Sequence, residues 1–303
     1  MDEPTRCAHV ALIGEPNAGK STLLNRMVGA KVAAVTHKVQ TTRARLRGVT
    51  TEGAAQLSFV DTPGLFRPRR RLDRAMVAAA WGGAGDADLL LLMVEAHRGL
   101  TEGVGRILDA LEEKAGRRTV ALVVNKIDAA DRAKLLETAQ ALNARRDFAA
   151  TFMISAQTGD GAPDLRRWLA ERAPEGPWLF DPDQLADAPM RALAAEITRE
   201  KLTLRLHQEI PYQLTVETEG WETFRDGSAR VDQVIYVGRE GHKGIVLGKK
   251  GETVKAVSAA ARSEIARMIE RPCHLFLRVL VRPNWEGDRE RYEAIGLDFS
   301  DGS

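Results

Sequence analysis

Short apolar runs alternate with longer amphipathic stretches as far as about residue 173. Six of these runs have the length and composition of buried strands: 7–13, 45–50, 55–60, 89–94, 120–124 and 151–154. Such alternation is typical of a mostly parallel sheet with helices on both faces. The pattern therefore predicts an α/β domain that binds ligands at the carboxyl ends of its strands.

A stretch rich in proline follows this alternation. Four prolines and one glycine interrupt residues 174–189, and such punctuation is typical of a linker between domains. We therefore expect a first domain at 1–174, a linker at 175–189 and a second domain at 190–303.

The segments after the linker have the order of a smaller α+β domain. Leu193, Ile197 and Leu204 share one face of a predicted helix. The elements predicted after it are two strands at 212–218 and 230–237, two helices that flank 243–251, and a strand at 274–281. In the first of these strands Leu214 and Val216 alternate with polar residues, which indicates a half-buried sheet.

Composition and charge limit the kind of protein. A chain of 303 residues, 44% hydrophobic and 28% charged, is long enough for two domains with their own cores. The net charge is +2, but residues 181–303 carry about 18 basic and 21 acidic side chains, so a nucleic-acid site there must be local. No apolar run is long enough for a membrane span, and the N-terminus lacks the apolar segment of a signal peptide. We expect a cytoplasmic monomer.

Cysteine and histidine give no sign of a disulfide or of a zinc site. Cys7 and Cys273 lie in different predicted domains, which favours reduced thiols. The six histidines show no ligand spacing with cysteine or carboxylate. This leaves Mg²⁺, for which oxygen ligands are identified below, as the metal that the residues themselves predict.

The strongest chemical signal is Gly-Glu-Pro-Asn-Ala-Gly-Lys-Ser at 14–21, which fits the P-loop pattern G-x-x-x-x-G-K-S/T between a strand and a helix. Gly14 and Gly19 let the backbone wrap closely around phosphates, so that N–H groups and the positive helix end face them. Lys20 would reach the outer phosphates and the Ser21 hydroxyl would ligate Mg²⁺. The residues expected to contact a nucleotide here are Glu15, Pro16, Asn17, Ala18, Gly19, Lys20, Ser21 and Thr22.

A polar loop at 37–45 separates the first predicted helix from the second strand. In a nucleotide switch, a threonine of such a loop closes on Mg²⁺ and the γ-phosphate when a triphosphate is bound. Thr42 is the preferred ligand, and Thr41 is the alternative.

The strand at 55–60 leads to Asp-Thr-Pro-Gly at 61–64. Asp61 can hold Mg²⁺ through water, and the Gly64 N–H can meet the γ-phosphate, so Lys20, Thr42 and Gly64 are the candidate catalytic residues. Leu65 stands where many GTPases carry a glutamine that orients the attacking water. An aliphatic side chain cannot hold that water, so either another group supplies it or intrinsic hydrolysis is slow.

Asn125, Lys126 and Asp128, which follow the strand at 120–124, indicate which nucleotide base the site binds. The Asp128 carboxylate can accept hydrogen bonds from N1–H and the exocyclic amine of guanine, at roughly 1.5–3 kcal/mol each. Adenine has neither donor there, so it would leave a buried carboxylate unpaired. The motif therefore predicts a guanine nucleotide.

The last strand of this domain leads to Ser155, Ala156 and Gln157, whose backbone can brace the guanine and its aspartate. Taken in sequence, these five motifs look like those of the translation-factor-related GTPases. Leu65 places the chain among the members with a hydrophobic residue at that position.

The motifs at 14–21, 40–43 and 61–65 resemble in particular the bacterial Era family of GTPases. Ala18 stands where that family usually has valine, and Phe66 where it often has histidine, and both positions are peripheral to the chemistry. The resemblance implies a Ras-like P-loop NTPase domain that hydrolyses GTP to GDP and phosphate.

A glycine-lysine turn stands between two predicted helices of the second domain: Gly248, Lys249, Lys250 and Gly251. In KH domains such a G-x-x-G turn clamps a nucleic-acid backbone, because the glycines permit close approach and the variable residues add positive charge. Lys243 adds another positive charge nearby. Between Arg239 and Arg282 there are about ten basic residues and only four acidic ones. The turn therefore predicts RNA binding.

The order of elements in the second domain again resembles the Era family, in which a type II KH domain follows the GTPase domain. The resemblance implies binding to the 3′ end of small-subunit ribosomal RNA and a role in assembly and maturation of the small ribosomal subunit. It also implies some peripheral association with the inner membrane. In related GTPases with a hydrophobic substitution, an asparagine at the position of Asn17 helps to bind K⁺, which makes K⁺ a second candidate cofactor.

Two other classes of function remain as alternatives. A P-loop kinase or ATPase would bind adenine, which the motif at 125–128 disfavours. An RNA-binding scaffold with a vestigial nucleotide domain would not need Lys20, Ser21, Asp61 and Asp128 all intact.

Overall fold

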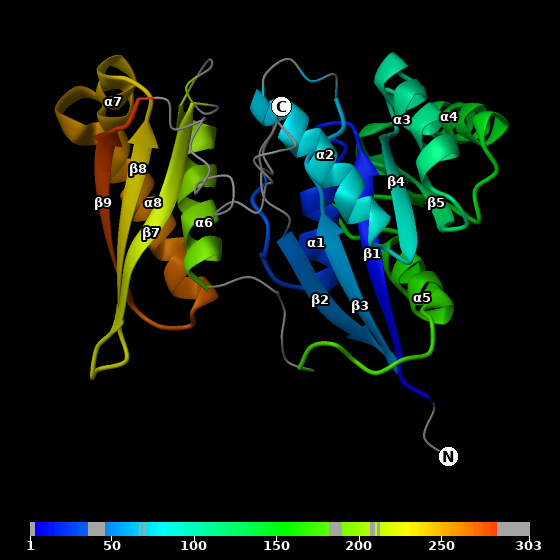
Figure 1. Ribbon diagram of the computed structural model, residues 1–303, viewed down its shortest axis with the longest axis horizontal. Helices are drawn as coiled ribbons and strands as arrows, with labels where there is room; N and C mark the ends of the chain where they lie inside the picture. The colour runs from blue at the N-terminus through cyan, green and yellow to red at the C-terminus, as the bar shows by residue number, and fades with distance from the viewer. Residues whose placement is uncertain are drawn as a thin grey trace. The chain divides into compact units, whose positions relative to one another are not determined.

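The computed structural model describes residues 4–35, 46–66, 68, 71–181, 190–206, 210 and 213–283. They form two compact units (Figure 1), one from β1 (Arg6–Gly14) to α5 (Ala162–Arg172) and the other from α6 (Met190–Arg205) to β9 (Cys273–Val281). The linker predicted at 175–189 stays a prediction, because residues 182–189 lie outside the described part of the chain.

The first unit is built on a six-stranded sheet. Its strands are β1, β2 (Leu46–Glu52), β3 (Ala55–Asp61), β4 (Leu89–Glu95), β5 (Thr119–Asn125) and β6 (Thr151–Ile154), in the spatial order β2-β3-β1-β4-β5-β6. β2 runs antiparallel to β3, and the other neighbouring strands are parallel. The predicted mostly parallel sheet is confirmed. β4 and β5 are apolar along nearly their whole length because both of their faces are covered.

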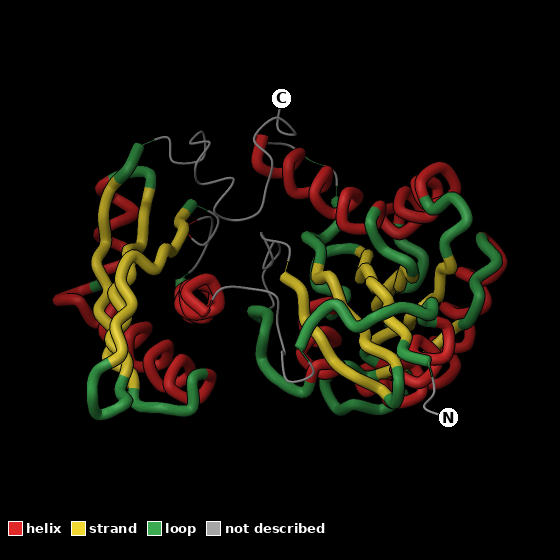
Figure 2. Tube along the Cα trace, turned by 60° about the horizontal axis from the view of Figure 1, so that its bottom comes forward, coloured by secondary structure: helices red, strands yellow, loops and turns green. Residues whose placement is uncertain are grey.

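Helices cover both faces of this sheet (Figures 1 and 2). They are α1 (Lys20–Val28), α2 (Arg71–Gly85), α3 (Glu102–Lys114), α4 (Arg132–Arg145) and α5. Ala80 of α2, Leu108 of α3 and Leu142 of α4 share one hydrophobic cluster with Leu90 and Leu92 of β4. α1 and α5 contact β2, β3 and each other. The parallel strands thus end at one edge, where the loops to the helices carry the predicted motifs.

The described part of the predicted linker is held by the first unit. The Cys7 N–H donates to the Pro174 carbonyl at 3.0 Å. The side-chain oxygen of Gln56 accepts from the N–H groups of Leu179 and Phe180, at 2.9 and 3.0 Å. The chain after α5 is therefore fixed along the amino ends of β1 and β3.

The second unit has the predicted order α-β-β-α-α-β. Its elements are α6, β7 (Leu214–Thr223), β8 (Ala229–Val237), α7 (Glu240–Leu247), the 3-10 turn η3 (Lys249–Gly251), α8 (Glu252–Met268) and β9. β8 is the central strand, antiparallel to β7 and parallel to β9. This element order and sheet are those of a type II KH domain, as expected.

One expected core residue of this unit is exposed. Leu193 and Ile197 of α6 are buried as predicted, but Leu204 is 47% exposed, and Leu202 is fully buried instead. The reason is that α6 crosses two hydrophobic clusters, one containing Ile197 and the other Leu202 and Leu206. The buried side of the helix therefore changes along its length, and a single-face pattern could not reveal that.

Candidate functional site

The loop between β1 and α1 has the backbone that its sequence predicts. Gly14 and Gly19 have φ angles of +153° and +97°. A Cβ atom on Gly14 would lie 2.4 Å from the Met93 carbonyl oxygen, and one on Gly19 would lie 2.1 Å from Nδ2 of Asn125. Glycine is required at both positions, because the loop must pass this close to β4 and to Asn125.

Lys20, the first residue of α1, turns its side chain back onto this loop and is 6% exposed. Its Nζ donates to the carbonyls of Gly14 at 3.1 Å and Glu15 at 2.9 Å. Burial lowers the pKa of Lys20 to about 8, against the opposing effect of the Asp61 and Glu15 charges. The ammonium is thus held among carbonyl oxygens at the place where an anion would bind the loop.

Ser21 and Asp61 meet as the predicted metal ligands. The Ser21 hydroxyl donates to Oδ2 of Asp61 at 2.6 Å, and Asp61 is fully buried at the end of β3. A hydroxyl and a carboxylate are oxygen ligands of the kind that Mg²⁺ prefers. The pair therefore fits Mg²⁺. The third predicted ligand, Thr42, and its alternative, Thr41, lie outside the described residues.

The segment after Asp61 is tied to the P-loop. The Leu65 N–H donates to the Gly14 carbonyl at 2.9 Å. A Cβ atom on Gly64 would lie 2.7 Å from the backbone nitrogen of Pro16, so only glycine fits there. The Leu65 side chain is 5% exposed and belongs to the hydrophobic cluster that also contains Leu90 and Leu92 of β4. It therefore packs into the core, where it cannot orient a water molecule.

Asn125 bridges two of the predicted motifs. Its Nδ2 donates to the Ala18 carbonyl at 2.8 Å, and its Oδ1 accepts from the Ala156 N–H at 2.9 Å. The side chain is 1% exposed. The structure thus brings the P-loop, Asn125 and the loop after β6 together. The sequence predicted contact of Asn125 with the nucleotide, and its bridging role is new.

Arg26 of α1 is a further residue of this region that sequence reasoning missed. Its Nε donates to the Ala156 carbonyl at 3.3 Å, and its Nη2 donates to the Gln157 carbonyl. Oγ of Ser155 accepts from the Thr158 N–H at 3.1 Å and closes the same loop. Arg26 gave no signal in the sequence, because an arginine in a helix is usually only a solvated side chain.

Asp128 lies where a base can reach it. It belongs to the short 3-10 turn η1 (Ile127–Ala129) after β5. Its side chain is exposed, and not buried as predicted from the sequence, because only a bound base would cover it. Lys126, just before it, has a left-handed backbone with φ 67°. Both residues therefore lie at the carboxyl edge of the sheet, next to Asn125.

The turn that is predicted to clamp RNA lies between two helices of the second unit, as expected from the sequence. Gly248 and Gly251 flank Lys249 and Lys250 in the turn η3 between α7 and α8. A Cβ atom on Gly248 would lie 2.2 Å from Oγ1 of Thr253, and φ is positive at all three of Gly248, Lys250 and Gly251. Both lysines are exposed. The fifth predicted contact, Lys243, lies on α7 and is partly exposed.

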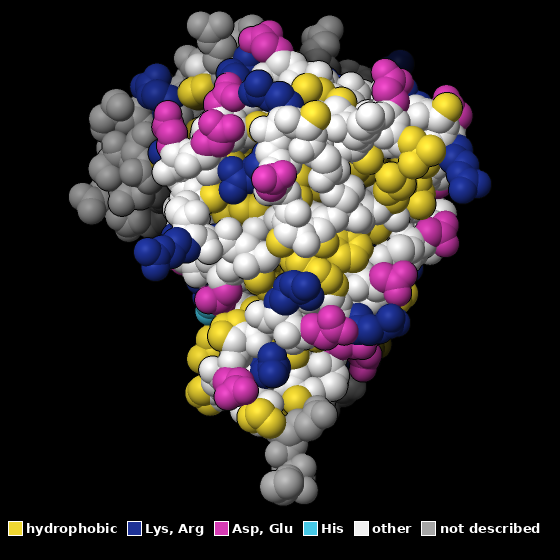
Figure 3. Space-filling model, turned by 90° about the vertical axis from the view of Figure 1, so that its right-hand side faces the viewer, with side chains coloured by type: hydrophobic (Ala, Val, Ile, Leu, Met, Phe, Trp, Pro, Cys, Tyr) yellow, Lys and Arg dark blue, Asp and Glu magenta, His cyan; other side chains and the backbone are white. Residues whose placement is uncertain are grey.

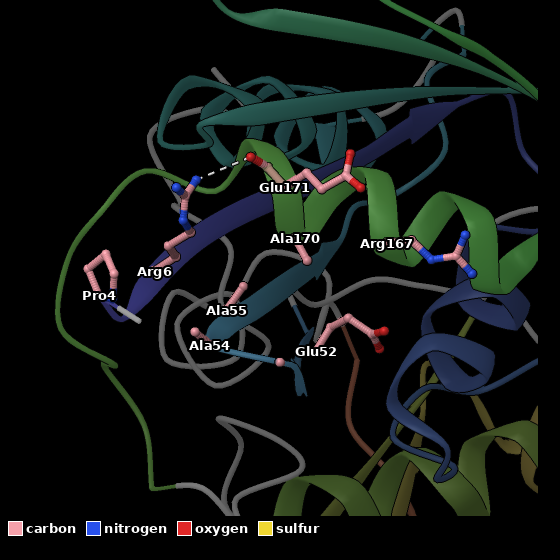
Figure 4. A pocket seen from close by; sticks show the side chains of 9 residues that line it. Pro4, Arg6, Glu52, Ala54, Ala55, Arg167, Ala170 and Glu171 are labelled. Carbon is pink, nitrogen blue, oxygen red and sulfur yellow. Dashed lines mark hydrogen bonds between the residues drawn. The ribbon is translucent and has the colours of Figure 1, made fainter. Parts of the chain in front are cut away.

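A cavity of ≈ 490 Å³ lies elsewhere in the first unit (Figure 4). It is lined by Pro4, Arg6, Glu52, Gly53, Ala54, Ala55, Arg167, Ala170 and Glu171. Arg6 and Ala55 begin β1 and β3, so the cavity is at the end of the sheet opposite the P-loop. The Arg6 guanidinium donates there to the Glu171 carbonyl at 3.2 Å. This cavity is therefore separate from the candidate nucleotide site.

One face of the molecule carries mixed charge (Figure 3). Basic and acidic side chains are interspersed on it, with small groups of apolar side chains between them. An anionic polymer would meet repulsion and attraction alike on such a surface. The described side chains of this face thus form no extended basic patch.

Nucleotide affinity is expected to fall as the pH rises through about 8. A bound phosphate adds negative charge beside Lys20 and so favours the protonated ammonium. Below pH 8 that ammonium is already protonated, whereas above it the neutral amine must take up a proton when phosphate binds. The dissociation constant for GDP should rise about fivefold from about pH 7 to about pH 8.7, a range that ends before guanine loses its own N1 proton.

A fluorescent GDP analogue measures this directly at constant ionic strength. The melting temperature at each pH serves as the control for unfolding. An affinity that stays constant across the range would show that the Lys20 ammonium keeps its proton throughout.

Two family models match the chain. The one described as 50S ribosome-binding GTPase matches residues 9–126, and the one described as KH domain matches residues 209–286. The first match lies within the predicted first domain and the second within the predicted second domain.

Curated relatives match nearly the whole chain. GTPase Era of Dinoroseobacter shibae is 67% identical over 301 residues, which is 99% of this chain and 98% of that protein. GTPase Era of Brucella suis is 58% identical over 295 residues, which is 97% of this chain and 94% of that protein.

Solved structures agree. A crystal structure of Era with MgGDPNP and nucleotides 1506–1542 of 16S ribosomal RNA has a TM-score of 0.90 at 33% identity, and covers 96% of this chain and 99% of that one. A variant of Aquifex aeolicus Era bound to GDP and AlF4⁻ has a TM-score of 0.90 at 32% identity, with the same coverage of both chains. With this similarity over nearly its whole length, the chain belongs to the Era family of GTPases.

Proposed function

We propose that this chain is a GTP-hydrolysing switch that binds the 3′ end of small-subunit ribosomal RNA and acts in assembly and maturation of the small ribosomal subunit. The observation that carries this proposal is the presence of a guanine-type P-loop site and a type II KH clamp on one chain. The related Era structure holds MgGDPNP and nucleotides 1506–1542 of 16S ribosomal RNA, the same two classes of ligand.

In this proposal the first unit binds the phosphates. The Lys20 ammonium, now shared by two carbonyls, turns to the β- and γ-phosphates. Ser21 and Asp61 would hold Mg²⁺, together with Thr42 as the predicted switch ligand. When bound, Mg²⁺ neutralises charge that develops on the phosphate oxygens. The Gly64 N–H, on a segment hydrogen-bonded to the P-loop, can donate to the γ-phosphate.

The guanine is held at the other end of the site. Asp128 accepts from N1–H and the exocyclic amine, and the loop at 155–157 covers the base from the side. Asn125 and Arg26 both hydrogen-bond to the backbone of this loop. The loop is therefore already ordered, and nucleotide binding does not have to overcome the entropy cost of fixing it. An adenine nucleotide would leave Asp128 without its donors. A titration with guanine and adenine nucleotides therefore separates this proposal from a kinase or an ATPase.

Intrinsic turnover is expected to be slow, on the order of 10⁻³ s⁻¹ or below, as in switch GTPases without a partner. The reason is Leu65, which packs into the core and leaves the attacking water without a side chain to orient it. Single-turnover hydrolysis of GTP measures the rate. Faster turnover without any partner would contradict the argument from Leu65, and undetectable turnover would favour an RNA-binding scaffold.

We further propose that K⁺ raises this rate through Asn17, which has a left-handed backbone in the P-loop at φ 66°. The same single-turnover assay in K⁺ and in Na⁺ at equal ionic strength tests the idea. A higher rate in K⁺ supports it, and equal rates remove it.

The remaining expectations concern the setting in which the protein works. We propose a cytoplasmic monomer with some peripheral association with the inner membrane. None of the helices in the described ranges is long and apolar enough to cross a membrane. Sedimentation of the purified protein with and without lipid vesicles tests the oligomeric state and the membrane association together.

A further inference from the structure

Glu95 is the last residue of β4 and lies beside the base-recognition motif. In the sheet it is paired with Asn125 of β5. Its side chain is 11% exposed. The carboxylate contacts two side chains, Nζ of Lys126 at 3.1 Å and Nε2 of His97 at 2.6 Å. It is thus a mostly buried acid whose partners include the lysine between Asn125 and Asp128.

The backbone holds this acid firmly in place. The Ala96 N–H donates to the Asn125 carbonyl at 2.8 Å, which continues the pairing of β4 with β5. The Glu95 carbonyl accepts from the N–H groups of Arg98 and Gly99, both at 3.1 Å. The backbone that carries the carboxylate is therefore fixed, and the carboxylate itself is held between Lys126 and His97.

Lys126 is held from its other end by the turn. Its backbone is left-handed, with φ 67° and ψ 40°, and its carbonyl accepts from the Ala129 N–H at 3.1 Å. The side chain is 35% exposed, less than expected for a free lysine on a loop. Because the backbone of Lys126 and its ammonium are both fixed, the alkyl stem between them has a defined position. It lies close to Asp128, which is predicted to bind the base.

We propose that Glu95 is a positioning residue for guanine nucleotides: by holding the Lys126 ammonium, it fixes the lysine stem against one face of the base. Lysine stems cover flat apolar surface while their ammonium stays with a polar partner. Without the carboxylate the stem would be free, and binding would have to order it. Glu95 itself does not touch the nucleotide. The inference deepens the proposed function and rests on it.

The test is a double-mutant cycle of Glu95→Gln and Lys126→Ala, measured as GDP affinity and dissociation rate. Glu95→Gln should weaken GDP binding by about tenfold, which is about 1.4 kcal/mol. In the Lys126→Ala background the same change should cause no further loss, because the stem that it positions is absent. Glu113→Gln, an exposed acid on α3, is the matched control and should bind like the wild type.

A third variant separates positioning from folding. Lys126→Met keeps an apolar stem but removes the ammonium, so it should lose GDP affinity by the same factor as Glu95→Gln. The proposal is overturned if Glu95→Gln binds GDP as the wild type does, or if Lys126→Met keeps full GDP affinity. It is also overturned if Glu95→Gln reduces GDP affinity by the same factor in the Lys126→Ala background as in the wild type. Should the wild type itself not prefer GDP to ADP, the proposed function fails and not merely the role of Glu95.

Discussion

Replacing Asp128 by Asn is expected to move the nucleotide preference from guanine toward xanthine. In the proposed site the Asp128 carboxylate accepts two hydrogen bonds from guanine, whereas an amide can donate to the 2-oxo group that xanthine has in place of the amine. Losing two charge-assisted bonds, at roughly 1.5–3 kcal/mol each, should weaken GTP binding by at least a hundredfold. The affinity for XTP should rise at the same time, so the ratio of the GTP and XTP affinities changes more than either affinity alone.

The comparison requires both nucleotides on both proteins. Asp147→Asn is the matched control, because this exposed aspartate lies in the loop before β6 and not in the base site. The fold should be unaffected, since Asp128 is exposed on the turn η1. If the Asp128 variant still preferred GTP over XTP by the wild-type margin, the base would be recognised by other residues.

Changing Lys249 and Lys250 together to Asp is expected to remove most of the RNA affinity. Both side chains are exposed in the turn η3, so the change should leave the fold intact. It would replace two positive charges by two negative ones where the phosphates approach. RNA affinity should fall by at least tenfold, roughly 1.4 kcal/mol, and its salt dependence should become shallower.

Two controls accompany this variant. Arg262 and Arg267, both exposed on α8, changed together to Asp give the same change of charge away from the turn and should bind RNA more nearly like the wild type. GTP affinity without RNA should not change, because the nucleotide site belongs to the first unit. Wild-type RNA affinity of the Lys249 and Lys250 variant at moderate salt would mean that the turn is only structural.

The strands and the phosphate motifs could be predicted because local sequence determines them. A strand covered on both faces, such as β4, must be a continuous apolar run. Gly14 and Gly19 are required by the backbone of the loop itself, and a Ser21–Asp61 pair follows from the sheet order that brings the ends of β1 and β3 together.

The missed residues depend on tertiary contacts. Arg26 and Glu95 act through partners 130 and 31 positions away in the sequence, on neighbouring elements of the fold. Nothing in their immediate neighbours marks an arginine on a helix or a glutamate at a strand end as part of a base site. The prediction that Leu204 is buried was wrong for a related reason. The buried side of α6 depends on which hydrophobic cluster each turn of the helix contacts.

We expect RNA to bind at the turn η3 of a chain that also binds guanine nucleotides. A crosslinking map of RNA bound in the presence of GTP can show this, with an oligonucleotide that carries the 3′ end of small-subunit ribosomal RNA as the probe. Crosslinks are expected at Lys243 and at the turn from Gly248 to Gly251. Crosslinks confined to other surfaces, with the turn unmodified, would show that the RNA binds elsewhere.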